Sequence, residues 1–280
     1  MKNIIYYKKF CKYIVMTVNN TLKYKNHFFY PYAGSKRTEV ERIVNFIDLT
    51  NIDTIIEPFC GSCAFSFYIA SLYPNRFKYI LNDNDTHLIE LLKTATDKEQ
   101  LDVFIDDVNN KCFGDDGNFI SKNDYNALKK DKTIINNFIH KKYYNIRPTL
   151  YPMDKKVSPI NIDDIPIVKF LQNENVCICS EEGANIYNKY KDVDNTLIFL
   201  DPPYMLSSNY FYVNPCDNIY KELCNDRDIF NTFKSIVVCC LENTWIVQLL
   251  FKDLTDKTHI KYSKKYGSQR CVEHIVIKNK

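Results

Sequence analysis

A carboxylate and an aromatic ring separated by two prolines are the residues of this chain best suited to chemistry. Residues 197–200 are Leu-Ile-Phe-Leu and predict a short buried strand, and Asp-Pro-Pro-Tyr follows at 201–204. Because the prolines end the strand, Asp201 and Tyr204 are expected at its carboxyl end, where ligands bind in open α/β sheets. An acceptor beside a flat ring suits a planar heterocycle that bears an amino group. A stiff turn at a strand end explains the same four residues equally well.

The turn after an earlier predicted strand suits a nucleotide-like ligand. Residues 54–57 predict a strand ending at Glu57, and a turn of small residues leads to a helix that ends near Leu72. In the first β-turn-α unit of a nucleotide-binding sheet, small residues let a ligand approach the backbone. Gly61 provides one such position, but Cys63 lies where a second glycine is often found. The turn is therefore a weak fingerprint by itself.

Two aspartates follow the next predicted strand, around residues 78–82. Asp83 comes first after the apolar run, and an acid at this place accepts hydrogen bonds from ribose hydroxyls in such sheets. Asp85 is better placed to cap a helix predicted from His87 to about Lys93. We therefore expect the two carboxylates to have different roles.

A Gly-Ser-Lys turn at 34–36 joins an aromatic segment, residues 28–32, to an amphipathic helix predicted over 38–48. Backbone N–H groups and a cation at the start of a helix suit an anion such as a carboxylate. The turn is no P-loop, because the Gly-x4-Gly-Lys spacing is absent. A surface position explains Lys36 equally well.

Predicted strands and helices alternate on both sides of a segment that breaks this alternation. Residues 97–172 combine helices with polar loops, so we expect them to be an insert in an α/β domain formed by 28–96 and 173–280, after an N-terminal extension at 1–27. The helices expected in the insert span 99–108, 122–130 and 132–141. The later elements of the domain are expected at 176–179 (strand), 181–191 (helix), 220–234 (helix), 235–241 (strand), 244–251 (helix), and 258–262 and 270–278 (terminal antiparallel hairpin with a basic loop at 263–269).

The composition indicates a globular protein and names no partner. Of the 280 residues, 45% are hydrophobic and 25% charged, which excludes a disordered chain. The net charge of +3 is too small to indicate nucleic acid by itself. Lysines cluster at 122–142 and again between 261 and 270, where solvated faces are a commoner explanation than phosphate contacts.

The cysteines indicate a reducing compartment. There are 11, an odd number, and the sequence has neither a secretory signature nor a stretch that approaches a membrane span. We expect a cytoplasmic or other intracellular, DNA-containing location rather than secretion. Cys60-x-x-Cys63 is the one zinc-like spacing, and no second pair follows at a finger-like distance, so we expect no metal site.

Taken in order, these motifs carry a family resemblance. The aromatic-Gly-Lys turn, Glu-Pro-Phe-Cys-Gly from Glu57, Asn82-Asp83 and the Asp-Pro-Pro-Tyr motif at 201–204 resemble the Dam-like DNA adenine-N6 methyltransferases (D12 class, α-type motif order). The resemblance spans roughly residues 28–280. It implies a Rossmann-like, S-adenosylmethionine-dependent methyltransferase sheet, with residues 97–172 as an inserted, mainly helical target-recognition domain.

The resemblance implies catalytic roles for three residues. Asp201, helped by the Pro202 carbonyl, would accept a hydrogen bond from the adenine amino group, and Tyr204 would stack on the flipped base. The loop after Tyr204 and the terminal hairpin would close over the DNA.

The resemblance also implies a set of residues that bind S-adenosylmethionine. Tyr32 and Lys36 would lie near its methionine part, and Asp83 would bind its ribose. The full set comprises Tyr32, Lys36, Glu57, Phe59, Gly61, Asp83 and Asp201. Two departures from the family pattern bear on cofactor affinity: Cys63 replaces a glycine, and Ser180-Glu181 stands where the family often has an aspartate.

The expected activity is transfer of a methyl group from S-adenosylmethionine to the N6 amino group of adenine in a specific sequence of double-stranded DNA. Alternatives are a related enzyme acting on cytosine N4 or on adenine in RNA, and a catalytically silent nucleic-acid-binding regulator of the same fold. The intact 201–204 motif and Lys36 argue against the silent regulator. A nicotinamide-dependent oxidoreductase is weaker still, since GxGxxG is missing.

Overall fold

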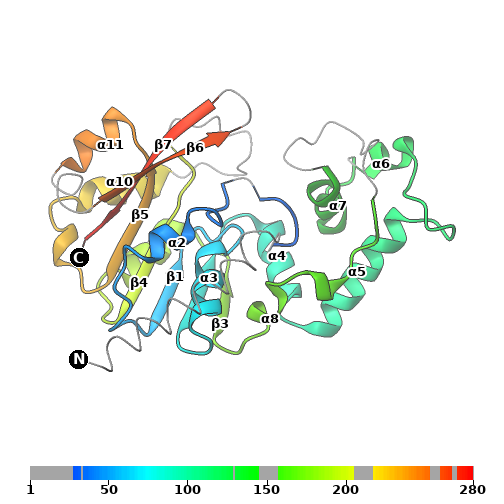
Figure 1. Cartoon of the computed structure of the whole chain (residues 1–280), viewed down its shortest axis with the longest axis horizontal. Coiled ribbons are helices and arrows are strands. Elements are labelled where there is room, and N and C mark those ends of the chain that lie inside the picture. The colour runs from blue at the N-terminus through cyan, green and yellow to red at the C-terminus, as the bar shows by residue number, and fades with distance from the viewer. Residues whose placement is uncertain are drawn as a thin grey trace, which may run out of the picture. The chain divides into compact units, whose positions relative to one another are not determined.

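The structure is a computed structural model that describes residues 28–32, 34–128, 130–144, 157–204, 217–252, 259–266 and 270–279. The chain divides into two compact units, one formed by residues up to Ser35 with Glu90–Glu174 and the other by Lys36–Ile89 with Asn175–Lys280 (Figure 1). This division places residues 28–35 with the predicted insert. The predicted extension at 1–27 and the loop after Tyr204 lie outside the described residues.

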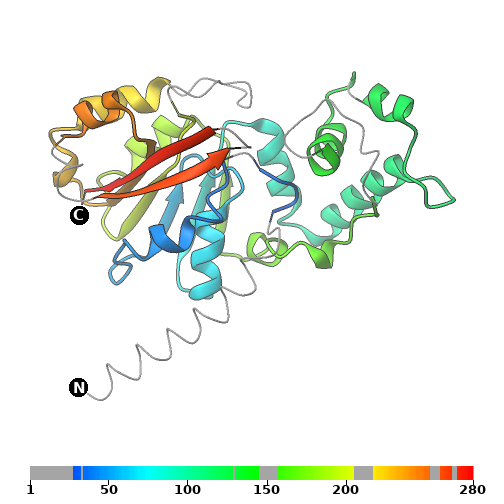
Figure 2. The same ribbon diagram turned by 45° about the horizontal axis from the view of Figure 1, so that its top comes forward.

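The second unit contains a seven-stranded sheet in the order β3-β2-β1-β4-β5-β7-β6 (Figures 1 and 2). The pairings from β3 to β5 are parallel, whereas β7 is antiparallel to both of its neighbours. This topology confirms the predicted Rossmann-like methyltransferase sheet. The strands are β1 (Thr54–Glu57), β2 (Lys78–Asn82), β3 (Val176–Cys179), β4 (Thr196–Leu200), β5 (Ile236–Glu242), β6 (His259–Tyr266) and β7 (Arg270–Lys278).

The strand order brings the predicted motifs to one edge of the sheet. The chain passes from β1 outward to β2 and β3 on one side, and from β4 to β5 on the other. The order therefore reverses between β1 and β4, and ligands bind at such a switch point, outside the carboxyl ends of the strands. Glu57 ends β1 and Asp201 directly follows β4 at this point.

Helices cover the sheet, and two of them differ from the prediction. The helix predicted at 38–48 is confined to α2 (Val40–Val44), and the one predicted at 220–234 ends at Asp226. The apolar residues beyond Asp226 still reach the core, because a 3-10 turn, η3 (Phe230–Thr232), buries Phe230. The elements with helical geometry that have a part in this unit are α2, α3 (Ala64–Leu72), α4 (Thr86–Thr94), α9 (Gly183–Tyr190), α10 (Asp217–Asp226), η3 and α11 (Trp245–Leu250).

The terminal hairpin is longer than predicted. The first strand, β6, continues to Tyr266, where the sequence predicted a loop from residue 263. Cross-strand pairing, from His259 with Ile277 to Tyr266 with Arg270, carries the strand through these polar positions. Alternation of side chains alone does not show where such a pairing ends.

The described part of the first unit is mainly helical. Its elements are α5 (Lys98–Cys112), α6 (Lys122–Leu128), α7 (Ile134–Tyr144), η1 (Ile162–Asp164) and α8 (Val168–Leu171), and its described residues add one isolated β-bridge. Phe138 of α7 contacts Phe104 of α5 edge to face, with ring centroids 5.3 Å apart. Phe29 and Tyr30 pack on the same Phe138 ring at 6.5 and 6.0 Å. These contacts explain why the aromatic segment belongs to this unit.

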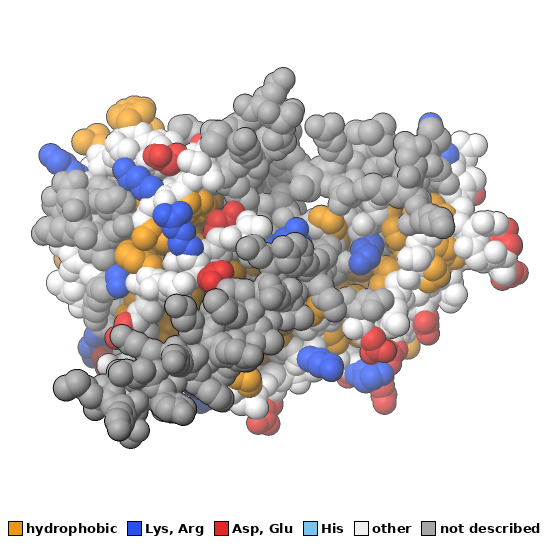
Figure 3. All heavy atoms as spheres, viewed as in Figure 1, with side chains coloured by type: hydrophobic (Ala, Val, Ile, Leu, Met, Phe, Trp, Pro, Cys, Tyr) orange, Lys and Arg blue, Asp and Glu red, His pale blue; other side chains and the backbone are white. Residues whose placement is uncertain are grey.

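One face of the molecule has mixed charge. Acidic and basic side chains lie interspersed on the face shown in Figure 3. In the part of the chain that the structure describes, no helix combines the length and apolar character needed to cross a bilayer.

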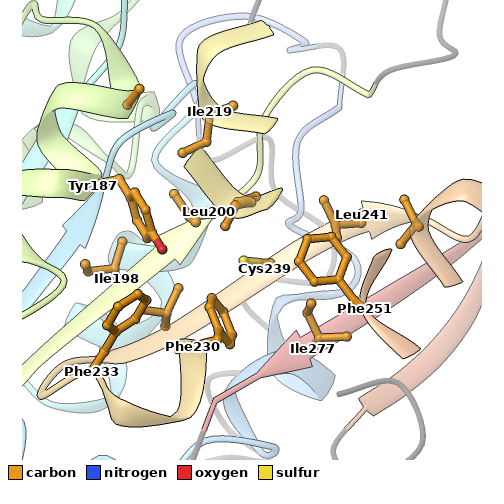
Figure 4. Close-up of a cluster of buried hydrophobic side chains, with 14 of the residues drawn as sticks. Tyr187, Ile198, Leu200, Ile219, Phe230, Phe233, Cys239, Leu241, Phe251 and Ile277 are labelled. Atoms are coloured by element: carbon orange, nitrogen blue, oxygen red, sulfur yellow. The ribbon is translucent and has the colours of Figure 1, made fainter. Parts of the chain in front are cut away.

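Buried side chains on both faces of β4 hold the strand that leads to Asp201. On one face, Ile198 and Leu200 belong to a cluster with side chains of α9, η3, β5 and β7 (Figure 4). On the other face, the Phe199 ring stacks on Phe65 of α3 at 3.9 Å, because successive strand residues point to opposite faces. Each such fully buried side chain contributes about 1.5–3 kcal/mol. The strand end is therefore a rigid support for the site.

Candidate active site

The central feature of the candidate site is a buried ion pair between Lys36 and Asp201. The Lys36 ammonium lies 2.5 Å from both carboxylate oxygens of Asp201, although the two residues are 165 positions apart in the sequence. Lys36 is 4% exposed. Its carbonyl accepts hydrogen bonds from the backbone N–H groups of Glu39 and Val40 as α2 begins. The surface explanation of Lys36 is thus wrong.

Electrostatics keeps Lys36 charged despite its burial. Burial is the largest influence and lowers the pKa of the ammonium, but attraction to Asp201, with smaller contributions from Tyr262 and Cys240, raises the pKa above its ordinary value overall. The pair is therefore an ammonium facing a carboxylate at neutral pH. Such a carboxylate offers its remaining lone pairs as strong hydrogen-bond acceptors.

Tyr204 completes a triad with this pair. Its hydroxyl lies 3.4 Å from Asp201 Oδ1, a long contact, and the Lys36 ammonium lies 5.4 Å from its ring centroid. The intervening turn is fixed by Tyr220, whose hydroxyl donates to the Pro203 carbonyl at 3.1 Å. The three predicted residues thus come together at the end of β4.

Two aromatic side chains from the terminal hairpin support the Tyr204 ring. His274 of β7 is fully buried, with its ring centroid 5.0 Å from that of Tyr204 and 5.1 Å from that of Tyr262 on β6. Neither residue was predicted from the sequence as a site component. The register of β6 and β7 places Tyr262 opposite His274, so a residue-level pairing would have been needed to find them.

Glu57 is a buried acid beside the triad. It is 2% exposed, and its Oε1 accepts a hydrogen bond of 2.9 Å from the backbone N–H of Ser66 in α3. Burial, with repulsion from Asp201 and Asp83, raises its pKa to about 8, although the contact with Ser66 opposes this shift. Glu57 therefore gains and loses a proton near neutral pH.

Asp83 and Asp85 make different contacts after β2. The Asp83 carboxylate accepts a hydrogen bond of 3.0 Å from the backbone N–H of Gly61, which joins the turn after β1 to the end of β2. Burial raises the pKa of Asp83. Asp85 caps α4 by accepting from the N–H groups of His87 and Leu88, which confirms the helix-capping prediction.

The turn between β1 and α3 contains two left-handed residues. Gly61 has φ of 46° and Cys63 has φ of 52°. Glycine adopts this conformation without steric cost, whereas a side chain with a Cβ is strained there. The backbone conformation therefore explains why a glycine is expected at position 63. Cys63 adopts the same conformation at a cost in steric strain.

Tyr32 and Phe59 were also predicted to contact the cofactor. Tyr32 belongs to the first unit, where its ring lies 5.8 Å from that of Phe28 and stacks on Tyr30 at 6.3 Å. Phe59 is half-buried in the turn after β1 and packs against the core of the second unit. The structure thus brings Phe59, but not Tyr32, into one unit with the triad.

Asn82, named above only as part of a motif, and Gly183 are further residues of this edge for which the sequence predicted no role. Asn82 is fully buried and bonds to the loops that follow β1 and β3. A Cβ on Gly183 would overlap the Phe59 ring. The scarcity of glycine, six in 280 residues, was the only sequence signal that could have drawn attention to Gly183.

The charges at this edge fit a cationic ligand. Glu57, Asp83 and Asp201 lie close enough for the two aspartates to raise the pKa of Glu57, and Lys36 supplies a single positive charge to the group. A ligand with a sulfonium and an ammonium, such as S-adenosylmethionine, would relieve this repulsion. Asp83 and the Gly61 turn, joined by their hydrogen bond, lie at the same edge.

The two cysteines with zinc-like spacing lie inside this turn. Cys60 and Cys63 are buried, and burial raises the pKa of both thiols, which disfavours the thiolates that bind metals. Among the described residues, no three His, Cys, Asp or Glu side chains are grouped so as to hold a metal ion.

Several solved structures resemble the chain. They include a human methyltransferase 10 domain containing protein (8% identity, 86% of this chain and 79% of that chain covered, TM-score 0.39). The precorrin-6y C5,15-methyltransferase of Geobacter metallireducens is similar at 11% identity, with coverage of 87% and 88% and a TM-score of 0.37. The N-terminal domain of human METTL16 in complex with SAH is similar at 6% identity, with coverage of 86% and 67% and a TM-score of 0.38. None of the curated proteins matches the chain.

A sequence profile of one family covers most of the chain. The profile described as D12 class N6 adenine-specific DNA methyltransferase matches residues 32–266 of 280, a range that contains the Lys36 turn, the β1 turn and the 201–204 motif. The chain therefore belongs to the D12 class N6 adenine-specific DNA methyltransferases, which transfer a methyl group from S-adenosylmethionine to the N6 amino group of adenine in DNA.

Proposed function

We propose that the end of β4 holds the target adenine and that the neighbouring edge of the sheet binds S-adenosylmethionine. The observation that carries this proposal is the buried Lys36–Asp201 pair beside Tyr204, located where the strand order reverses. A rigid charged acceptor next to an aromatic ring at this place suits an amino-bearing base.

Asp201 and Pro202 act on the amino group of the base. An exocyclic amine is a poor nucleophile, because its lone pair is delocalised into the ring. An acceptor oxygen of Asp201 and the Pro202 carbonyl bind its hydrogens and direct the lone pair outward, while Lys36 fixes the carboxylate. When bound, S-adenosylmethionine supplies an electrophilic methyl group on a sulfonium. The contribution of the chain is then positioning and charge placement.

Tyr204 provides a face for the base after it leaves the stack. Extrusion from the duplex costs a few kcal/mol, and stacking on an aromatic ring returns about 1–3 kcal/mol per base. His274, 5.0 Å away, keeps the ring from turning away from the base. This arrangement supports double-stranded DNA as the substrate.

The cofactor is bound by residues on the turns after β1 and β2 and by the Lys36 segment. Asp83 binds the ribose hydroxyls, and the Gly61 turn lets the ligand approach the backbone. Glu57 and Asp201 face its positive charges. The proposed set is completed by Tyr32, Lys36 and Phe59.

The helical residues between α4 and β3 act as the target-recognition domain. The α7 helix carries Lys141 and Lys142 in its last turn, which suit contacts with phosphates. An enzyme of this kind works where DNA is present, so we place it in the cytoplasm or another intracellular compartment that contains DNA.

Mass spectrometry of nucleosides tests the catalytic part of the proposal. After incubation with duplex DNA and S-adenosylmethionine, the wild-type protein should produce N6-methyladenine, and Asp201→Ala should produce none above background while remaining folded by circular dichroism. Near wild-type turnover of Asp201→Ala would overturn the role of this residue. Methylation of RNA or of cytosine in preference to adenine in DNA would overturn the proposed substrate.

Titration calorimetry tests the cofactor part. Lys36→Ala and Asp83→Ala should each weaken binding of S-adenosylmethionine at least about tenfold, since each removes a positioned charged group. Unchanged affinity in both variants would reject these roles. Glu90→Ala, at an exposed position of α4, is a surface control and should bind as the wild type does.

A further inference from the structure

We propose that Asn82 is a positioning residue that locks three loops of the cofactor edge into one unit. The loops follow β1, β2 and β3, and they carry Phe59, Gly61 and Asp83. The inference rests on the proposed cofactor role of this edge and adds a residue that does not itself bind the cofactor. Its role is to fix the relative positions of the residues that do.

The side chain of Asn82 uses both ends of its amide to join two loops. Its Nδ2 donates to the Pro58 carbonyl at 2.9 Å and to the Glu181 carbonyl at 3.0 Å. Its Oδ1 accepts from the Glu181 N–H at 2.8 Å. Pro58 lies in the turn after β1, and Glu181 in the loop after β3. Both amide hydrogens are used, so neither an aspartate nor an apolar residue reproduces these bonds.

The backbone of Asn82 makes a fourth hydrogen bond, which also reaches the turn after β1. Its carbonyl accepts from the Cys60 N–H at 2.7 Å. The next residue, Asp83, accepts from the Gly61 N–H at 3.0 Å. Asn82 and Asp83 therefore bond to three of the four residues 58–61 of the β1 turn.

The same two loops also meet through Phe59. The ring of Phe59 lies against Gly183, so closely that a Cβ at Gly183 would overlap it. Gly183 begins α9, two residues after Glu181. The hydrogen bonds of Asn82 thus set the spacing of the loops, and the absence of a side chain at Gly183 gives the Phe59 ring its place.

Asn279 offers a matched control at the opposite edge of the sheet. Its Oδ1 accepts from the Val237 N–H at 2.9 Å, and its Nδ2 donates to the carbonyls of Phe230 and Ser235 at 3.2 and 3.0 Å. It is 8% exposed. Asn279 therefore makes the same three kinds of side-chain bond as Asn82, but it joins segments at the amino end of β5.

The test compares Asn82→Ala with Asn279→Ala. Asn82→Ala should raise the Kd and the KM for S-adenosylmethionine roughly tenfold or more, because misplaced binding groups lose affinity steeply. Its kcat at saturating cofactor and its Kd for duplex DNA should stay within about twofold of wild type, since the triad at β4 is unchanged. Asn279→Ala should lower the urea midpoint about as much as Asn82→Ala does. It should leave the Kd and the KM for S-adenosylmethionine unchanged.

The outcomes separate this inference from the proposed function. A cofactor Kd of Asn82→Ala equal to that of Asn279→Ala, with Asp83→Ala weakened, would overturn the role of Asn82 alone. An unchanged Kd in Asp83→Ala would instead overturn the cofactor role of the edge. If Asn82→Ala fails to fold, Asn82→Asp decides. Aspartate keeps the acceptor oxygen and loses both donors, so its cofactor Kd should rise, and an unchanged Kd would overturn the inference.

Discussion

Two lysine–aspartate–tyrosine triads lie at opposite edges of the same sheet. The carboxyl-edge triad has an ammonium–carboxylate distance of 2.5 Å, a tyrosine hydroxyl 3.4 Å from the carboxylate and the ammonium 5.4 Å from the tyrosine ring. In the amino-edge triad the same three distances are 2.7, 2.9 and 5.4 Å. The first consists of Lys36, Asp201 and Tyr204, and the second of Lys191, Asp226 and Tyr187.

The surroundings of the amino-edge triad give it a structural role. Lys191 follows α9 and Asp226 ends α10, so the ion pair joins the two helices. The Lys191 carbonyl also accepts from the N–H and the hydroxyl of Ser235, just before β5. Tyr187 is fully buried in the core cluster. All three residues are thus occupied in holding elements together.

The carboxyl-edge triad differs in its neighbours rather than in its own geometry. It lies where the strand order reverses, after a turn that two prolines stiffen, and beside the acid Glu57. The same residue types at similar distances therefore hold elements together at one edge and form the proposed active site at the other. The position of such a triad on the sheet, rather than its residue types, therefore distinguishes a candidate active site from a packing contact.

Alanine in place of the two aspartates should separate these roles most strongly. Asp201→Ala should lower methyl transfer by at least about 10³-fold, the scale of losing a positioned electrostatic group. Asp226→Ala should keep turnover within about threefold but lose about 3–5 kcal/mol of unfolding free energy, because the largely buried Lys191 loses its partner. Methyl transfer assays and urea unfolding measure the two effects. Equal losses of turnover would contradict the comparison.

The pH dependence of stability should show the protonation of Glu57. This acid lies beside the carboxyl-edge triad and not beside the amino-edge triad. Its pKa in the folded chain, about 8, exceeds the ordinary 4.5, so the folded state retains a proton that the unfolded state loses. Stability from this group is present below about pH 4.5 and lost as pH rises to about 8, at about 1.4 kcal/mol per pH unit.

Glu57→Gln provides the measurement, because glutamine resembles the protonated acid. The free energy of unfolding of the variant minus that of the wild type should increase from pH 5 to pH 8 in urea titrations. In an Asp201→Ala background the increase should be smaller, since one source of repulsion is gone, whereas Asp226→Ala should leave it unchanged. A constant difference across this range would show that Glu57 is ionised throughout.

Substitution of the two tyrosines, Tyr204 and Tyr187, should give the next largest effect. Tyr204→Ala should lower kcat/KM by roughly 5- to 150-fold, the equivalent of about 1–3 kcal/mol of base stacking, and Tyr204→Phe should restore most of it. Tyr187→Ala should instead cost about 3–5 kcal/mol of stability through a core cavity. Loss of activity in Tyr204→Phe comparable to that of the alanine variant would assign the effect to the hydroxyl rather than to the ring.

The smallest effect concerns a left-handed residue at each edge. Cys63 in the carboxyl-edge turn has φ of 52°, and Asn195 before β4 has φ of 55°. Asparagine tolerates this region better than other residues that have a Cβ. Cys63→Gly should therefore be more stable than Cys63→Ala by up to about 1 kcal/mol, because glycine has no Cβ to strain the turn. At Asn195 the change to glycine should be close to neutral. Thermal unfolding of these variants provides the check, and a more stable Cys63→Ala would show that the turn is unstrained.

The sheet was predictable because burial imposes a simple pattern on its strands. The parallel strands β1 to β5 lie within one residue of their predicted bounds, since strands covered on both faces read as short apolar runs. The acids and the Asp-Pro-Pro-Tyr motif follow these runs directly, so their edge could be predicted as well. The helix end at Asp226 and the length of β6 depend on tertiary pairing and could not.

The contacts within the site were beyond local reasoning because their partners lie far apart in the sequence. Asn82 bonds to Pro58 and Glu181, which are 24 and 99 positions away. Nothing in the residues around Lys191 indicates its ion pair with Asp226. Periodicity places residues on elements, but only the assembled sheet selects which side chains meet.

The separation of 165 positions between Lys36 and Asp201 has a consequence for folding. Closing so long a loop costs conformational entropy that only a formed sheet can offset, so the pair must assemble after β1 and β4 have docked. During refolding, helical signal should return before the capacity to methylate DNA. The proposed catalytic centre therefore forms only in the completely folded chain, and folding intermediates cannot methylate DNA.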